Sequence, residues 1–421
     1  MQPKILLFIA ILASALGAQT SAQMTLATCL QIAFENHPAV QSGGWQIKAL
    51  EADYHREKAG YFPALSLDGQ HQQFFYREYN FRQQGLLLTG DWSAGNWLKN
   101  SAASAAQSIE AGKANLSEIR LSLAQRIAGV YFSILQTDLQ QQSLDNQKSL
   151  LAQHSRIAEA LWQSGARTRL DLLQTRAATI ALEQQQKENH YRRAEFRNEL
   201  AVLLNRGANE LPVVANFPNH VLADTITDAQ QIFLMLQKQH PGLQSLDFQI
   251  RAAQLQRRKI SADLLPHVQM WGGYIADGDP TAEGNYGTVG LGVSVPLYHW
   301  GQSKFEKEAA AASIRDLEFQ RSQLQNELKI IAEKLANEIS KLNEIMDLQR
   351  EQLAISLEAF ELAESHYEAG LVTNVEYLDA QQQWQENRLQ LQNSQLQQQR
   401  QMIEIFLLTG NYPHIAQLQG E

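Results

Sequence analysis

The 421-residue chain contains one cysteine, ten prolines and few charged side chains, which make up 19% of its residues. With Cys29 alone, no intrachain disulfide can form. The segment Leu26–Cys29 faintly resembles a lipoprotein cleavage site, although Thr28 suits that site poorly. The favoured interpretation of Cys29 is a small apolar residue on a helix face. The scarcity of proline and the clustering of glycine predict long, uninterrupted elements.

Sequence motifs for enzyme chemistry are also missing. There is no His-Glu-x-x-His, no Gly-x-Ser-x-Gly and no phosphate loop, and the glycine-rich 287–292 begins a predicted strand instead of preceding a helix. The eleven histidines, His154 among them, are scattered without metal-ligand spacing and are expected on the surface. The formal charge of −9 argues against a nucleic-acid partner. These absences predict neither catalysis, metal nor cofactor.

Long apolar runs are absent except near the N-terminus. Lys4 precedes an apolar run from Ile5 to Gly17, and small residues follow at Thr20–Ala22. This pattern predicts a secretory signal peptide over residues 1–22. The run is shorter than the roughly 20 apolar residues that a spanning helix needs.

An internal duplication accounts for nearly all of the remaining chain. His37-Pro38 recurs as His240-Pro241, and Gly165 has its counterpart in Gly370 at nearly the same offset. A nearly constant offset through several landmarks indicates two structural repeats. The predicted division is a first repeat 23–212, a linker 213–225, a second repeat 226–412 and a tail 413–421.

Each repeat follows one order of predicted elements. A short amphipathic helix and a Pro-initiated helix precede a strand hairpin, about 63–94 in the first repeat and about 266–298 in the second. A helical hairpin follows, about 96–206 and about 301–409. Its first helix, of about 65 residues, would be roughly 100 Å long, too long for a globular core. Glutamine covers the return helices, either for solubility or to face a water-filled lumen.

The hairpin tips are predicted near 165–168 and 370–373. A glycine, Gly165 or Gly370, ends one helix in the left-handed conformation, and Thr168 or Thr373 can N-cap the next. Asp171 and Glu376 then fall in the first turn, where the helix dipole favours a carboxylate.

The predicted strands alternate between apolar side chains and small or polar ones, as in Val289, Leu291 and Val293. Aromatic residues, including Trp271, flank them. One interpretation is the edge of a water-soluble sandwich. The favoured interpretation is part of a membrane β-barrel. Four strands cannot close a barrel alone, and an open sheet edge is not tolerated in lipid, so strands from other chains are required. Three chains would supply twelve strands.

The order and duplication of these motifs resemble the TolC-like outer-membrane efflux proteins over about residues 24–412. The residues that carry the resemblance are His37-Pro38, His240-Pro241, Tyr61-Phe62-Pro63, 293–298 followed by Gly301, and Gly370 through Ala380. The resemblance implies a mainly α fold with a small β part. It implies a homotrimer in a Gram-negative outer membrane, in which a 12-stranded barrel in lipid joins a periplasmic α-helical barrel.

The resemblance also implies a passive channel-tunnel of a tripartite efflux or type I secretion system. Its hairpin tips would dock a periplasmic adaptor (membrane fusion) protein linked to an inner-membrane pump, and its cargo would be small molecules or metal cations. The tip residues concerned are Gly165, Arg167, Thr168, Gly370, Leu371, Val372 and Thr373. Where Val372 stands, family members can carry an arginine that helps lock the entrance; the first repeat has Arg167 there.

By position in the motif, Asp171, Glu376 and Asp379 match the acidic residues that narrow the tunnel entrance. In a trimer they would form rings that attract cations. Alternatively, Asp171 and Glu376 are only helix N-terminal carboxylates. The competing hypothesis for the whole chain is a soluble periplasmic coiled-coil adaptor or scaffold, which usually carries one helical hairpin and not two.

Overall fold

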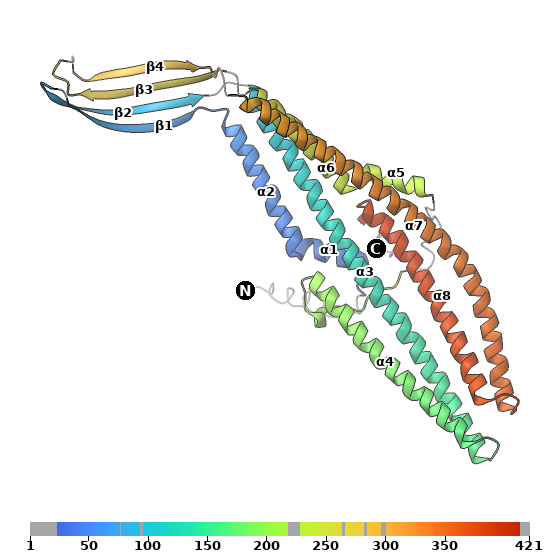
Figure 1. The fold of residues 1–421 in the computed structure, drawn as a ribbon. Coiled ribbons are helices and arrows are strands. Elements are labelled where there is room, and N and C mark those ends of the chain that lie inside the picture. Colours follow the sequence, from blue (N-terminus) through green and yellow to red (C-terminus); the bar gives the residue numbers. More distant parts are fainter. Residues whose placement is uncertain are drawn as a thin grey trace, which may run out of the picture. The chain divides into compact units, whose positions relative to one another are not determined.

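The computed structural model describes residues 23–75, 77–92, 96–217, 228–262, 266–281, 284–295 and 300–412 (Figure 1). The predicted signal peptide 1–22, the tail 413–421 and residues 218–225 of the predicted linker lie outside these ranges. The chain forms two compact units, which are described separately below.

The first unit contains the helical hairpins and their tips. Complete helices in it are α1 (Leu26–Asn36), α4 (Arg169–Leu203), α5 (Ala229–Gln239) and α8 (Asn374–Leu408), with a 3-10 turn η1 (Ala208–Glu210). It also holds the later parts, from Ile119 and Leu328 onward, of α3 (Asn96–Gln163) and α7 (Gln302–Glu368). The bounds of α3, α4, α7 and α8 confirm the predicted long helices and their shorter return helices.

A buried tyrosine ties the N-terminal segment to this unit. Met24 and Val214 form a short parallel bridge, and the Tyr131 hydroxyl donates to the carbonyl oxygens of Ala215 (2.6 Å) and Met24 (3.2 Å). The side chains of α1 that are buried include that of Cys29. Cys29 is therefore an apolar residue on a buried helix face, as interpreted from the sequence.

The second unit contains a four-stranded sheet with the helices that adjoin it in the chain. Helices α2 (Pro38–Ala59) and α6 (Pro241–Ala262) begin at the prolines of the His-Pro pairs, as predicted. The strands β1 (Ala64–Phe75), β2 (Asn80–Trp92), β3 (His267–Asp277) and β4 (Tyr286–Ser294) follow in the order β1-β2-β3-β4, all antiparallel. The two predicted hairpins thus join through β2 and β3, leaving one edge on β1 and one on β4.

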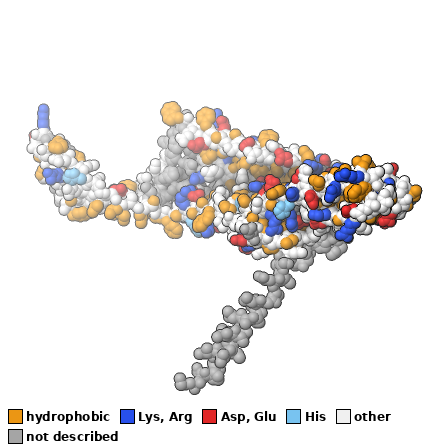
Figure 2. Space-filling view, turned by 90° about the horizontal axis from the view of Figure 1, so that it is seen from below, with side chains coloured by type: hydrophobic (Ala, Val, Ile, Leu, Met, Phe, Trp, Pro, Cys, Tyr) orange, Lys and Arg blue, Asp and Glu red, His pale blue; other side chains and the backbone are white. Residues whose placement is uncertain are grey.

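One face of the sheet is apolar and exposed. Cross-strand pairs place Leu67 beside Leu88, Leu86 beside Tyr274, and Met270 beside Leu291. With Leu65, Val289 and Val293 these side chains form what we call the apolar face, and every member is exposed. Figure 2 shows orange hydrophobic side chains along one side of the sheet, at the left of the view. Period-two patterning predicted this face correctly.

Trp271 lies on the opposite face of the sheet, as the alternation of side chains along β3 requires. Its ring covers Gly290 and Gly292; a Cβ built on Gly290 would lie 2.1 Å from the ring. The two glycines therefore leave the space that the indole fills. Among the helices described, none has a stretch long and apolar enough to cross a membrane.

Candidate functional site at the hairpin tips

Both tips lie in the first unit and share one backbone geometry. Gly165 (φ 76°) and Gly370 (φ 79°) are left-handed, as predicted. Around the first, Ala166 N donates to Leu161 O (2.9 Å) and Gly165 N to Trp162 O (3.0 Å), which is the Schellman pattern. The same pair of bonds forms around Gly370. No atom lies within 4 Å of a Cβ built on either glycine, so the positive φ alone demands glycine.

The N-caps of the return helices differ between the tips. The Thr373 hydroxyl accepts from Glu376 N (3.3 Å), while the Glu376 carboxylate accepts from Thr373 N (2.6 Å), which forms a capping box. Thr168 occupies the same position before α4 but makes no side-chain cap bond; its hydroxyl donates to the Asp171 carboxylate (3.3 Å). Both threonines were predicted as N-caps, and only Thr373 caps with its side chain.

Arg167 reaches from the first tip to the second. Its Nη2 donates to the carbonyl oxygens of Tyr367 (3.2 Å) and Val372 (2.6 Å), and its guanidinium lies 4.7 Å from the centroid of the Tyr367 ring. Tyr367 lies in the last turn of α7, where the helix dipole carries partial negative charge, so a cation is favoured there. Arg167 of the first repeat thus binds the second turn. In that turn Val372 occupies the position at which family members can carry an arginine.

Asn374, the first residue of α8, connects the two hairpins with its amide. It is 1% exposed, and its Nδ2 donates to Asp171 O and to Gln174 Oε1, both at 3.2 Å. These two acceptors orient the amide, so its Oδ1 is the acceptor for His154 Nε2 at 2.7 Å. Asn374 therefore joins α8 to both helices of the other hairpin.

His154 of α3 is 1% exposed, so its expected surface position was wrong, as it was for the buried His240. The imidazole stacks on Tyr377 (centroids 3.9 Å apart, 13° between planes) and contacts Tyr367 (4.7 Å). Phe360 joins the same buried cluster and stacks on Trp384. Burial lowers the pKa of His154, against the smaller opposing effects of the Asn374 hydrogen bond and the Asp171 charge.

The three predicted acidic residues lie at different places on the return helices. Asp171 and Glu376 are in the first turns of α4 and α8, as predicted, and Asp379 follows one turn later with an exposed side chain. Hydrogen bonds from the backbone and then the hydroxyl of Thr373 lower the pKa of Glu376. Glu376 thus acts as a helix N-terminal carboxylate. Its place in an acidic ring of the trimer stays a prediction.

The remaining predicted tip residues are largely accessible. Gly165, Thr168, Gly370, Leu371 and Thr373 are exposed, whereas Val372 packs against the aromatic cluster. The cluster of His154, Asn374, Tyr367 and Tyr377 was not predicted from the sequence. The one signal in the sequence is a difference between the repeats in the residue after the N-cap threonine. The second repeat has Asn374 there and the first has Arg169.

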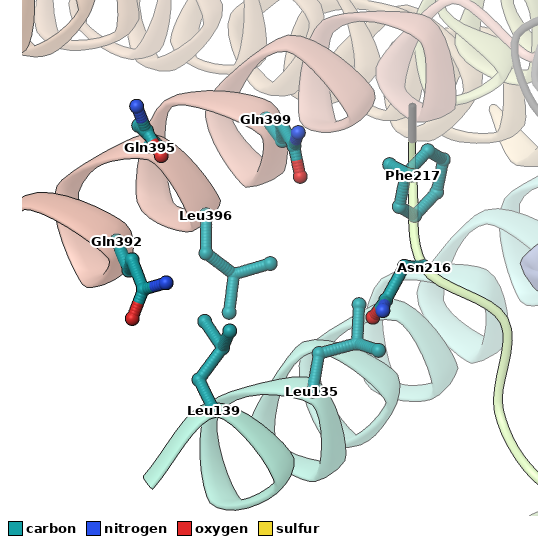
Figure 3. A pocket seen from close by; sticks show the side chains of 8 residues that line it. All are labelled: Leu135, Leu139, Asn216, Phe217, Gln392, Gln395, Leu396 and Gln399. Atoms are coloured by element: carbon teal, nitrogen blue, oxygen red, sulfur yellow. The ribbon is translucent and has the colours of Figure 1, made fainter. Parts of the chain in front are cut away.

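A second feature of this unit is a cavity of about 350 Å³ between α3 and α8 (Figure 3). Leu139 and Leu396 point toward one another across it, and three glutamines of α8 and Phe217 complete much of the lining. None of the described residues that line it is charged. Among the residues described, no three His, Cys, Asp or Glu side chains gather to hold a metal.

Two outer membrane export proteins are similar to this chain in sequence. The pyoverdine export outer membrane protein OpmQ of Pseudomonas putida is 26% identical over 312 residues, 71% of this chain and 65% of the relative. OpmQ of Pseudomonas aeruginosa is 24% identical over 70% of this chain and 63% of its own length. The aligned region spans less than two thirds of either relative.

Solved structures share the fold at low sequence identity. CusC superposes with a TM-score of 0.77 at 17% identity, covering 92% of each chain. The outer-membrane channel OprN gives 0.76 at 16%, covering 91% of this chain and 89% of OprN. VceC of Vibrio cholerae gives 0.73 at 16%, covering 90% and 95%. These likenesses confirm the mainly helical, duplicated fold.

The family match covers both repeats. Residues 29–206 and 234–411 each match the outer membrane efflux protein family, which is a family of channel and export proteins and not of enzymes. The alternative of a soluble adaptor or scaffold finds no support in this match. The chain therefore belongs to the outer membrane efflux protein family, and its location is the outer membrane.

Proposed function

We propose that this chain is the outer-membrane channel of a tripartite efflux or type I secretion system. Three copies form a 12-stranded β-barrel joined to a periplasmic α-helical barrel. Each repeat, 23–212 and 226–412, supplies two strands and one helical hairpin. The channel is passive, because export is driven by the inner-membrane pump and no residue of this chain needs to perform chemistry.

The apolar face of the sheet is the observation that carries this proposal. Val289, Leu291 and Val293 of β4 are 92%, 68% and 64% exposed, and their neighbours on the other strands are exposed as well. Contiguous exposed apolar surface marks a membrane or protein contact. The edges on β1 and β4 carry unpaired backbone groups, which lipid does not tolerate. Sheets from other copies satisfy both requirements at once.

The tips supply the surface for the periplasmic adaptor. Exposed apolar side chains surround both turns: Leu170, Leu173, Leu371 and Val375. Gly165, Arg167, Thr168, Gly370, Val372 and Thr373 set the backbone that presents them. A helical hairpin of the adaptor can cover these side chains, which stay accessible in the single chain.

The cargo is drawn from small molecules and metal cations. The two OpmQ relatives are named for pyoverdine export, but at 26% and 24% identity over part of their length this supports export and not that substrate. The protein carries cargo through its lumen with no cofactor of its own.

Paired substitutions on β4 test the membrane barrel. Leu291→Arg places a charge on the apolar face, and Thr288→Arg places the same charge on the opposite face. We expect Leu291→Arg to reduce insertion strongly, at a cost of about 2–4 kcal/mol per copy, and Thr288→Arg to leave it nearly unchanged. Insertion is measured by trimer yield in the outer-membrane fraction and by conductance in planar bilayers. A wild-type protein that stays monomeric in solution without detergent would overturn the proposal.

A separate variant tests the acidic entrance. The combined variant Asp171→Ala, Glu376→Ala and Asp379→Ala is expected to weaken the cation selectivity of single channels in bilayers. The control removes three exposed carboxylates farther along the same return helices, Glu183, Glu188 and Glu386. Unchanged selectivity in the tip variant, or an equal loss in the control, would contradict the acidic entrance.

A further inference from the structure

We propose that His154 is a proton-sensitive joint between the two helical hairpins of one protomer. The joint is closed while the imidazole is neutral and loosens when the ring takes up a second proton. The joint goes beyond the export function and does not rest on it.

The hydrogen-bond pattern assigns the proton of the neutral ring. Asn374 Nδ2 is committed to the acceptors Asp171 O and Gln174 Oε1, so Asn374 Oδ1 must accept from His154 Nε2. The remaining nitrogen, Nδ1, is buried and has no hydrogen-bond partner among the described residues. A second proton on the ring would therefore sit on Nδ1 with no acceptor.

The surroundings oppose a cation at this place. The ring lies against Tyr377 and Tyr367 and is 1% exposed, so a charged imidazole loses nearly all of its hydration. Separating the hairpins returns the ring to water. Protonation and separation are thus linked, since the separated state binds the proton more tightly.

The charged groups around the joint do not cancel this effect. Asp171 of α4 favours the imidazolium, but burial has the larger influence on the pKa of His154 and lowers it. Arg167 already places a cation over the Tyr367 ring. The titratable and charged groups that face the cluster from the packed elements are Arg167, Asp171, Glu364, Tyr367, Glu368 and Tyr377.

The sign of the pH dependence follows from the lowered pKa. The ordinary pKa of histidine is about 6.5. Above that pH the His154 ring is neutral whether the hairpins are joined or separated, so the joint has its full strength. Below that pH the separated state is protonated first. The equilibrium then shifts toward separation by up to about tenfold per pH unit, until the pH reaches the lowered pKa.

Distances between spin labels on the two tips measure the joint directly. Cysteines replace the exposed Ser164 and Ala369 in a full chain that also carries Cys29→Ala, and the labelled protein is studied in detergent. We expect the short distance within a protomer to broaden and lengthen from pH 7.5 to pH 5.5. His154→Gln and His154→Phe, neither of which can be protonated, should abolish this change.

The control is His366→Gln, which removes the other histidine near the second tip and should keep the response. Asp171→Asn removes the carboxylate that favours the imidazolium, so the separation at pH 5.5 should increase. An unchanged wild-type distance, or an equal response in the His154 variants, would overturn the proposal. If both His154 variants leave the tips apart at pH 7.5, the Asp171→Asn result decides it: no increase contradicts the joint.

These distances do not depend on whether the protein conducts ions. A protein that shows the response but forms no channel would contradict the proposed function alone. A protein that conducts ions but whose distance between the tips does not change with pH would contradict the joint alone.

Discussion

The two hairpin tips have nearly the same backbone but different side-chain roles. Each ends its long helix on a left-handed glycine with the same pair of turn bonds. The second tip has a complete capping box and a buried Asn374 that bonds the other hairpin. The first tip has neither, and its Arg167 instead binds the carbonyls of the second. The two tips thus share one turn geometry, while Arg167 of the first and Asn374 of the second supply different polar contacts between the hairpins.

Asn374 and its repeat counterpart Arg169 give the largest expected difference. Asn374→Leu leaves the buried His154 Nε2 without its acceptor and removes the amide's bonds to Asp171 O and Gln174 Oε1, which together should cost about 3 kcal/mol of hairpin contact. Arg169 is exposed, so Arg169→Leu should cost under about 0.5 kcal/mol. Native-state hydrogen exchange of the first turns of α4 and α8 measures both. Equal losses would show that the tips are not specialised as described.

Arg167 is expected to have the next largest effect. Arg167→Ala removes two hydrogen bonds from a cation to the second turn, at a cost of about 1.5 kcal/mol, because such bonds are stronger than neutral ones. Arg167→Lys should recover only part of the loss, since the ammonium lacks the planar fork. Exchange protection of the amides of 370–373 reports the change, with Arg169→Ala as the control on the same tip. Full recovery by lysine would mean that charge alone holds the second turn.

Substitution of the two N-cap threonines is expected to give a smaller difference in stability between the tips. Thr373→Ala breaks the capping box and should cost about 1 kcal/mol in the stability of the first turn of α8. Thr168→Ala removes no cap bond and should leave the first turn of α4 nearly unchanged. Helix-start amide exchange in the two variants checks this. A loss at Thr168 as large as that at Thr373 would contradict the observed difference in capping.

The smallest expected effect is the pH dependence of the second cap. Because the pKa of Glu376 is lowered in the folded chain, its contribution is present above the ordinary glutamate value. It is lost as the pH falls through the lowered pKa. Glu376→Gln should make the protection of the first turn of α8 independent of pH in this range, since glutamine can also complete a capping box. Persistent pH dependence in this variant would assign the effect to another group.

Local sequence patterns were sufficient for most elements. The long helices, the His-Pro helix starts, the four strands and the left-handed glycines follow from spacing and residue type, which act over a few neighbours. The exposed position expected for His154 was wrong, as was that for His240, because burial depends on which helix packs against that face. Strand periodicity also places Trp271 opposite the apolar face, whereas the room that Gly290 leaves for its ring depends on the pairing of β3 with β4.

The sequence by itself determined the duplicated order of elements, the lengths of the helices and the backbone of the two tips. Gly165, Gly370, Thr373 and the alternation in β4 impose these through torsion angles, capping and side-chain period. Only the tertiary structure decided that His154 meets Asn374, 220 residues away in the chain, within an aromatic cluster. Long-range packing sets that contact, because the burial of a polar ring is favourable only where another element supplies its partner.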